Sequence, residues 1–346
     1  MPQVTLIPTG QSFLAEPGET VLSAALRAGL NLPHSCKGGH CASCRARILS
    51  GAVEYCGEAP PGITPDEVRE GFALLCQARA LTDLRIETRE VRAAPDVEVK
   101  SLPCRIERLD RLAEDVMAVF LRLPAVEELH HRPGQYLDVM LSEGRRRSFS
   151  IASAPADGRQ LELHVRRASK SGFTAQLFES LKSGALLRIE GPLGQFWLRT
   201  ESPRPPLMIG GGTGYAPLRA MLRQLVATGD RRPVTLYWGA RDRNGLYEHE
   251  WLTELARTRP RFAYHPVLSD DAAAGDSFRR GLVHEAVLAD HPDLAGFDVY
   301  ASGPPAMIEA IRSGYVARGL PREQLFFDSF DYAPDTLARM KATPSP

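Results

Sequence analysis

Short apolar stretches and one amphipathic segment make up the first ninety residues. Two of the stretches predict a β-hairpin that turns near Pro8-Thr9-Gly10. Thr20 is a suitable N-cap for a helix over Val21–Ala28. The pattern therefore predicts a small α+β domain, whose expected strands are Val4–Ile7, Ser12–Leu14, Arg45–Leu49 and Leu84–Thr88.

Strand patterns follow one another between Cys104 and about residue 200. Turn signals such as Pro133-Gly134, Glu143-Gly144 and Asp157-Gly158 separate them. An antiparallel barrel or sandwich is the natural arrangement of such a series. The predicted strands are Val116–Leu123, Tyr136–Leu141, Arg147–Ile151, Leu161–Arg166 and Leu186–Glu190.

The hydrophobic pattern changes after Pro206. Apolar strands there alternate with helical stretches near residues 217–228, 247–257, 281–288 and 304–317. This alternation predicts a doubly wound α/β domain with a parallel sheet. Its expected strands are Leu207–Ile209, Val234–Trp238, Phe262–Val267 and Asp298–Ala301.

The changes of pattern divide the chain into domains at residues 1–92, 101–202 and 203–335. Residues 92–100 include Ala93-Ala94-Pro95 and suit a linker. The 346 residues carry 42 basic and 42 acidic side chains, which gives no electrostatic argument for a nucleic-acid or anionic-membrane partner. No apolar run approaches the roughly 18 residues of a membrane span, and the N-terminus lacks a secretory pattern, so we expect a cytoplasmic protein.

All six cysteines precede residue 105. Cys36, Cys41 and Cys44 have the spacing C-x4-C-x2-C, and Cys76 follows alone, which is the plant-type [2Fe-2S] arrangement. A zinc site with four cysteine ligands is the alternative, but such sites usually take their ligands from two short C-x2-4-C segments. His34 and His40 are interpreted as polar loop residues, and Cys56 and Cys104 as small buried ones.

Two basic or hydroxyl-rich segments of the middle domain suit a phosphate-bearing cofactor. Arg147-Ser148-Phe149-Ser150 provides a guanidinium for a phosphate and a hydroxyl for a heterocycle, although a basic hairpin end is also a common solvated turn. His164-Val165-Arg166 ends the next strand, and Gly172-Phe173-Thr174 opens a helix.

Gly210-Gly211-Gly212-Thr213-Gly214-Tyr215-Ala216-Pro217 lies between a predicted strand and a predicted helix, the context that a dinucleotide-binding loop requires. No phosphate-binding G-x-x-x-x-G-K-[ST] loop is present. Ser302-Gly303-Pro304 follows the last parallel strand, at the edge where ligands of such sheets bind, or forms a plain strand-to-helix turn. Phe326–Phe330 is either a buried final strand or an aromatic lid on a flavin ring.

The order of these motifs resembles the ferredoxin-NADP reductase superfamily in its three-domain form, over almost all of residues 1–335. Members include reductase components of phenol hydroxylase and other oxygenases, methane monooxygenase reductases, and the CDP-6-deoxy-glucoseen reductases, which three barrel stretches resemble most. The resemblance implies a β-grasp ferredoxin, an antiparallel β-barrel flavin domain and an α/β parallel-sheet nucleotide domain. It also implies Cys36, Cys41, Cys44 and Cys76 as cluster ligands.

The resemblance further implies where FAD and the nicotinamide nucleotide bind. FAD contacts would come from Arg147 (pyrophosphate), Ser148, Phe149, Ser150 (flavin N5 edge), His164, Val165, Arg166, Gly172 and Thr174. The nucleotide would lie on Gly211, Gly212, Thr213, Gly214 and Tyr215. Ser302, Gly303 and Pro304 would lie beside the nicotinamide, with Phe330 near the flavin, so Ser150, Ser302 and Phe330 are the expected catalytic group.

Two positions depart from the family pattern. Phe149 replaces the usual Tyr, which keeps stacking and loses a hydroxyl, and Ser302 replaces the frequent Cys. Arg241 and Arg243 could meet the 2′-phosphate of NADPH or face solvent; we favour NADH, because a phosphate-selective site normally gathers several cationic groups.

A hydride carries two electrons and a [2Fe-2S] cluster accepts one, so a flavin between them is the converter that the chemistry needs. The sequence predicts an oxidoreductase that passes electrons from NADH to FAD, to the cluster and to a partner protein, either an oxygenase component or a CDP-4-keto-6-deoxyglucose-3-dehydrase type enzyme. The alternative is a redox-sensing or electron-carrier module without sustained NADH turnover. Residues 1–92 hold ten acidic and nine basic side chains, so charge does not identify the acceptor.

Overall fold

The computed structural model describes residues 1–30, 32–34, 37–39, 44–60, 62–88, 98–142, 145–270 and 278–330. The chain divides into two compact units, Met1–Val97 and Glu98–Pro346. Most of the predicted linker, residues 92–100, lies outside the described residues. The barrel and the parallel sheet share the second unit, so the domain limits 101–202 and 203–335 stay predictions.

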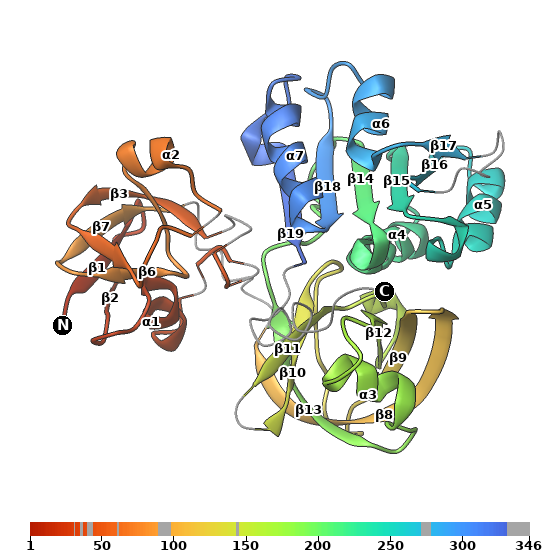
Figure 1. The fold of residues 1–346 in the computed structure, drawn as a ribbon, viewed down its shortest axis with the longest axis horizontal. Helices are drawn as coiled ribbons and strands as arrows, with labels where there is room; N and C mark the ends of the chain where they lie inside the picture. Colours follow the sequence, from red (N-terminus) through yellow and green to blue (C-terminus); the bar gives the residue numbers. More distant parts are fainter. Residues whose placement is uncertain are drawn as a thin grey trace. The chain divides into compact units, whose positions relative to one another are not determined.

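A five-stranded sheet in the order β2-β1-β7-β3-β5 forms the first unit (Figure 1). β1 pairs in parallel with β7, and the other pairs are antiparallel. The predicted cap is confirmed, because the Thr20 hydroxyl accepts a hydrogen bond from the Ser23 amide at 3.2 Å. The elements are β1 Gln3–Ile7, β2 Ser12–Leu14, α1 Val21–Arg27, β3 Arg45–Ser50, β4 Val53–Tyr55, α2 Pro65–Arg69, β5 Phe72–Leu74, β6 Ala78–Ala80 and β7 Leu84–Glu87.

An antiparallel six-stranded sheet in the order β11-β10-β13-β8-β9-β12 begins the second unit. Its outer strands meet at a bridge between Ile151 and Leu163, which closes the sheet into a barrel. The strands are β8 Lys100–Ala113, β9 Val116–Arg122, β10 Tyr136–Met140, β11 Arg146–Ser150, β12 Gln160–Arg166 and β13 Leu186–Leu193, with the helix α3 Phe173–Glu179 before β13. Of the two predicted alternatives, a barrel or a sandwich, the structure has the barrel.

The predicted doubly wound sheet follows, in the order β17-β16-β15-β14-β18-β19 with every pair parallel (Figure 1). Separate apolar clusters pack on its two faces. From β14 the chain builds outward to β17 and then returns to β18, so the order reverses between β14 and β18, where such sheets bind ligands. The elements are β14 Pro206–Gly211, α4 Tyr215–Thr228, β15 Val234–Ala240, α5 His249–Thr258, β16 Phe262–Leu268, β17 Arg279–Arg280, α6 Val283–Asp290, β18 Asp298–Gly303, α7 Pro305–Val316 and β19 Leu325–Ser329.

One local expectation was wrong. Cys56 is exposed rather than buried, because it follows β4 after the ladder has ended. His34 is a loop residue, as expected, and it is buried; its Nδ1 lies 2.8 Å from the Leu32 carbonyl, and burial lowers its pKa to about 4. Cys104 is buried as expected. His40 lies outside the described residues.

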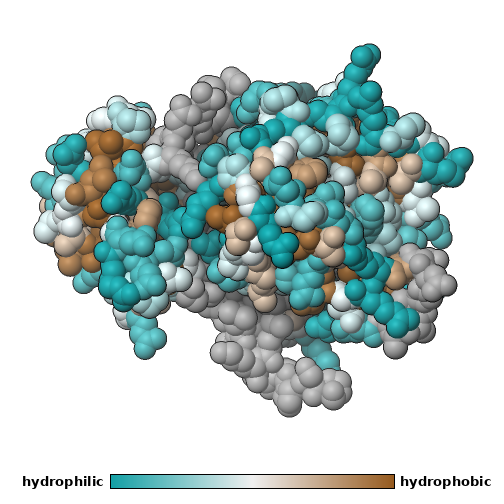
Figure 2. Space-filling view, turned by 90° about the horizontal axis from the view of Figure 1, so that it is seen from above, coloured by the Kyte–Doolittle hydropathy of each residue, from teal (hydrophilic) through white to brown (hydrophobic). Residues whose placement is uncertain are grey.

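Polar residues cover much of the surface shown in Figure 2, and hydrophobic ones appear there as separate patches. Within the described residues, no helix has the length and apolar character needed to cross a bilayer.

Candidate functional site

Two of the four predicted cluster ligands, Cys44 and Cys76, come together in the first unit. Cys44 immediately precedes β3, and Cys76 lies in the turn after β5; both are buried. The Cys76 amide donates a hydrogen bond to the Sγ of Cys44 at 3.5 Å. Amide donors of this kind stabilise the charge of cluster thiolates. The pair therefore fits an iron–sulfur cluster, while Cys36 and Cys41 lie outside the described residues.

The loop segment Lys37–Gly39 lies against Pro60 and against Gln77, which follows Cys76. Gly39 has φ +83°, and a Cβ there would lie 2.6 Å from the Cβ of Pro60 and 2.9 Å from the Cγ of Gln77. The Gln77 amide also donates to the Lys37 carbonyl at 2.8 Å. Glycine is therefore required at position 39, because both the backbone angle and the close approach exclude a side chain.

The predicted flavin strand is β11, which pairs with β10. The Ser148 hydroxyl donates to the Asp138 carboxylate at 2.6 Å. The Phe149 ring packs against that of Phe173, the first residue of α3, with centroids 5.9 Å apart. Asp138 was not predicted as a site residue, although its charge within an otherwise apolar strand was a visible signal. Ser148 is thus held by a buried carboxylate.

Arg147 and Ser150 occupy different environments on the same strand. The Arg147 guanidinium donates to the Arg146 carbonyl at 2.8 Å. Ser150 is buried and lies opposite Tyr136 in the ladder. The strand therefore offers a charged group on its surface and a hydroxyl near its carboxyl end.

β12 ends in the predicted segment His164-Val165-Arg166. The His164 Nδ1 lies 3.1 Å from the Tyr247 hydroxyl, and its Nε2 lies 3.0 Å from the Glu162 carboxylate. Val165 packs in the barrel core. Arg166 forms an ion pair with Asp115 at 3.2 Å and remains partly exposed. The His164 ring thus already has protein partners at both nitrogens, and Arg166 is the residue of the three whose side chain best suits a phosphate.

Gly172 and Thr174 lie at the start of α3, as predicted. Gly172 has φ +87° and precedes the first helical residue. The Thr174 hydroxyl accepts a hydrogen bond from the Ala168 amide at 3.2 Å. Thr174 thereby ties the loop after β12 to the helix.

The glycine loop at the end of β14 packs directly on the end of β18 and on Pro304, which follows it. A Cβ on Gly211 would lie 2.8 Å from the Cδ of Pro304, and one on Gly214 would lie 2.7 Å from the Cα of Gly303. The Gly214 Cβ would come closer still to the carbonyl of Ser302. Two predicted motifs, distant in sequence, therefore form one surface at the position where the strand order reverses.

The glycine loop also leads into α4 in a way that suits an anion. Residues Gly212–Gly214 form a 3₁₀ turn, and no side chain caps the first amides of α4, which begins at Tyr215. A Cβ on Gly212 would lie 2.9 Å from an Nη of Arg166. The Tyr215 amide donates to the Gly212 and Thr213 carbonyls, so the amides that suit an anion are those of the 3₁₀ turn itself. These amides, the helix dipole and the neighbouring guanidinium together fit a dinucleotide pyrophosphate. The Tyr215 ring is buried and stacks on Trp238, with centroids 4.0 Å apart.

Ser302 and Phe330 meet at Gly303. The Phe330 amide donates to the Gly303 carbonyl at 2.9 Å, which places the end of β19 beside the glycine loops. The Ser302 side chain is fully buried, and its hydroxyl has no hydrogen-bond partner among the described residues. Buried hydroxyls usually have a hydrogen-bond partner, so this position is a candidate for contact with a bound group.

Sequence reasoning missed a buried charged group centred on Arg219 of α4. Its Nη1 donates to the Glu162 carboxylate at 2.8 Å, and its Nε donates to the Glu248 carboxylate at 2.9 Å. Burial alone would lower the pKa of Arg219, but the two carboxylates more than compensate and raise it. Burial would raise the pKa of Glu162, whereas the bond from His164 and the charge of Arg219 lower it. Arg219 and Glu162 therefore both stay ionised at neutral pH.

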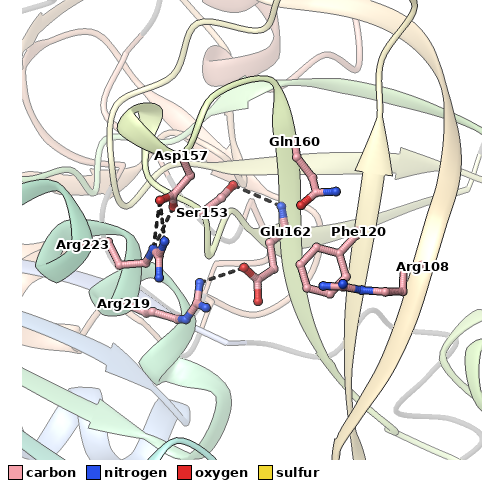
Figure 3. Close-up of a pocket in the computed structure, with 8 residues that line it drawn as sticks. All are labelled: Arg108, Phe120, Ser153, Asp157, Gln160, Glu162, Arg219 and Arg223. Carbon is pink, nitrogen blue, oxygen red and sulfur yellow. Dashed lines mark hydrogen bonds and ion pairs between the residues drawn. The ribbon is translucent and has the colours of Figure 1, made fainter. Parts of the chain in front are cut away.

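A polar cavity of about 330 Å³ adjoins this group (Figure 3). Arg219 and Arg223 of α4 point into it from one side, and Glu162 and Asp157 of the barrel domain from the other. The Arg223 guanidinium binds the Asp157 carboxylate, with an Nη2–Oδ1 distance of 2.6 Å. The cavity thus lies where α4 contacts the barrel, and its charged residues pair across that contact.

The fold and these sites define a three-part oxidoreductase: a ferredoxin, a flavin barrel and a nucleotide-binding sheet. Three family models match in this order, the 2Fe-2S iron-sulfur cluster binding domain at residues 4–81, the oxidoreductase FAD-binding domain at 103–197 and the oxidoreductase NAD-binding domain at 208–313. The chain belongs to the ferredoxin-NADP reductase superfamily in its form with an N-terminal ferredoxin.

Curated relatives extend over nearly the whole chain. The CDP-6-deoxy-L-threo-D-glycero-4-hexulose-3-dehydrase reductase of Yersinia pestis is 36% identical over 94% of this chain and 98% of its own length. The reductase component of phenol 2-monooxygenase from Pseudomonas sp. strain CF600 is 35% identical over 96% of this chain and 95% of its own length. These two relatives are of the reductase kinds that the motifs of this sequence resemble.

Solved structures agree with the three-part architecture. The cytochrome P450 reductase of Amycolatopsis has a TM-score of 0.76 and 33% identity, covering 95% of this chain and 99% of its own. The ferredoxin reductase of carbazole 1,9a-dioxygenase has a TM-score of 0.69 and 26% identity, covering 95% and 98%.

Proposed function

We propose that this protein is an NADH-dependent reductase that passes electrons through FAD and a [2Fe-2S] cluster to a separate protein. The observation that carries the proposal is the junction of three predicted motifs: Gly214 against the Ser302-Gly303 loop, and Gly212 against Arg166. Nucleotide and flavin segments thus share one place at the reversal of strand order. FAD, when bound, supplies the conversion between a two-electron hydride donor and one-electron acceptors.

The chain's own residues would bind and orient the reactants. The backbone amides of the Gly212–Gly214 turn suit the nucleotide pyrophosphate. Arg166, which lies beside Gly212, suits a phosphate of FAD. Arg147 suits the FAD pyrophosphate, and Ser150 the flavin edge, while Phe149 supplies an apolar face against the ring system. Ser302 and Phe330 would lie beside the nicotinamide and the flavin, where close packing excludes water and fixes the distance between the rings.

NADH is the proposed electron donor. Arg243 stacks on Phe278, with its guanidinium carbon 5.0 Å from the ring centroid, and Asp242 accepts a bond from the Gly245 amide at 3.1 Å. A carboxylate in the loop after β15 suits a ribose hydroxyl and disfavours a 2′-phosphate. We therefore expect a lower Kd for NADH than for NADPH.

The proposed partner is an oxygenase or dehydrase component, as the names of the relatives suggest. The ferredoxin unit has nearly balanced charge, so we expect docking that responds weakly to ionic strength. We also propose a cytoplasmic location, because NADH and reduced cysteine ligands both belong to a reducing compartment.

Anaerobic purification followed by nucleotide titration tests the proposal. We expect two iron atoms, two acid-labile sulfides and one FAD per chain, with both chromophores bleaching at low NADH. Zinc in place of iron and sulfide would refute the cluster assignment. Flavin that NADH reduces once, without steady turnover on ferricyanide, would favour the redox-sensing alternative.

A further inference from the structure

The side chain of Arg219 connects three segments that the proposed mechanism needs in one geometry. Its Nη1 donates to the carbonyl of Ala152 at 3.0 Å and to the Glu162 carboxylate at 2.8 Å. Its Nε donates to Glu248, which precedes α5. Ala152 lies two residues beyond Ser150, the last residue of β11. One guanidinium on α4 therefore joins the segment directly after the flavin strand, β12 and the segment that precedes α5.

The carboxylate partners extend this connection to residues of the proposed site. Glu248 also accepts the Tyr215 hydroxyl at 2.7 Å, and Tyr215 is the first residue of α4 after the glycine loop. Glu162 also binds the ring of His164, which comes two residues before Arg166. Both ends of the group thus reach the segments that would hold FAD and NADH.

Burial makes the arrangement selective for arginine. The side chains of Arg219 and Glu162 are each 10% exposed, and that of Glu248 is 17% exposed. Arginine can donate to two carboxylates and a carbonyl from one rigid plane, whereas lysine is a compact charge that cannot reach all three at these distances. Loss of one donor would leave a buried acceptor unpaired.

A second arginine on the same helix provides a contrast. Arg223, one turn after Arg219, also pairs α4 with the barrel domain through Asp157 (Figure 3). Its side chain is 36% exposed, and its partner lies in a surface turn rather than on a strand of the proposed site. Arg223 therefore contributes to the same domain contact without touching the flavin strand.

We propose that Arg219 is a positioning residue for hydride transfer, which holds the glycine loop and the flavin strand at the separation that the reaction requires. This inference rests on the proposed function, in which NADH loses a hydride and FAD gains it. In this proposal Arg219 acts through the segments that it binds and not directly on either reactant. Its effect is on the alignment of the two rings, and misplacement by about 1 Å is enough to reduce such a rate by about 100-fold.

Arg219→Lys tests the proposal in the full-length holoprotein, with Arg223→Lys as the matched control. Stopped-flow reduction of the flavin gives the limiting rate and the Kd for NADH separately. We expect Arg219→Lys to lower the limiting rate by about 10- to 100-fold with Kd and FAD content within twofold of wild type. Arg223→Lys should leave all three within twofold.

Amide hydrogen exchange without added NADH provides a readout independent of activity. Arg219→Lys should speed exchange in residues 150–154 and 212–216, and Arg223→Lys should not. A wild-type limiting rate in Arg219→Lys, or equal losses in the two variants, overturns the proposal.

Two further results remain informative. If Arg219→Lys loses FAD, Glu248→Gln is tested instead, because this change alters only the nucleotide side of the charged group. A lowered limiting rate of flavin reduction in Glu248→Gln with full FAD content supports the proposal. A wild-type limiting rate in this variant overturns it. If NADH does not reduce the wild-type flavin, the proposed function fails, and the exchange comparison still decides whether Arg219 holds the two segments together.

Discussion

The contact between the glycine loop and the loop after β18 leads to a sharp prediction for Gly214→Ala. The added Cβ would overlap the Ser302 carbonyl and lie 2.7 Å from the Cα of Gly303, whereas carbon atoms in contact prefer about 3.5–4.0 Å. The two segments must therefore separate by at least about 1 Å, against backbone atoms that cannot rotate away. Overpacking of this kind costs about 1–3 kcal/mol of the free energy of unfolding.

The same displacement would act on the proposed reaction, because it moves the loops that hold the nicotinamide. We expect the limiting rate of flavin reduction by NADH to fall by about 100-fold, with the FAD content unchanged. Stopped-flow spectroscopy measures the rate, and thermal unfolding measures the stability.

Gly296→Ala is the matched control for Gly214→Ala. Position 296 is exposed and requires no positive φ, and no atom of the described residues lies within 4 Å of an added Cβ. Its unfolding free energy should stay within about 0.5 kcal/mol of wild type. A Gly214→Ala protein with wild-type stability and a wild-type reduction rate would refute the reasoning, since the loops would then not need their observed separation.

Three further predictions concern the cysteines and the buried charges. Cys76→Ser should remove the iron and the cluster absorption and lower cytochrome c reduction at least about tenfold, while ferricyanide reduction by the flavin continues; unchanged iron content would contradict the ligand assignment. Burial raises the pKa of Cys104 to about 12, so iodoacetamide at pH 8 should label exposed Cys56 in the native protein and Cys104 only after unfolding, as mass spectrometry would detect. Glu162→Gln should lower the free energy of unfolding by about 3 kcal/mol at pH 7. Because the pKa of Glu162 is lowered in the fold, this difference should persist above pH 5 and shrink as the pH falls below about 4; a difference independent of pH would argue against an ionised Glu162.

Local motifs were readable from the sequence because their chemistry lies in short spacings. The cap at Thr20, the cysteine spacing and the glycine loop each depend on neighbours within a few positions. Helix α2 was missed, although it has an equally local signal. Thr64 and Glu67 form a capping box, with 3.2 Å between the Thr64 hydroxyl and the Glu67 amide.

Long-range pairings were not readable in the same way. Arg219 binds Glu162 from 57 positions away and Glu248 from 29, and only the docking of α4 on the barrel brings them together. Strand β8 was missed because its outward residues are mostly charged, which hides the apolar series Leu102, Cys104 and Ile106. Both features depend on tertiary contacts rather than on local preference.

The replacement of cysteine by Ser302 is best understood from the packing of its backbone. The carbonyl of Ser302 lies against Gly214 and its neighbour Gly303 accepts the Phe330 amide, so the loop's path depends on main-chain contacts that either small side chain allows. What the serine changes is polarity, because its hydroxyl is buried without a partner among the described residues. Such a group reduces stability, and costs of this kind are retained mainly where function requires them. The departure from the family pattern is therefore compatible with the role proposed for Ser302, since the observed contacts of the junction at this position are made by main-chain atoms.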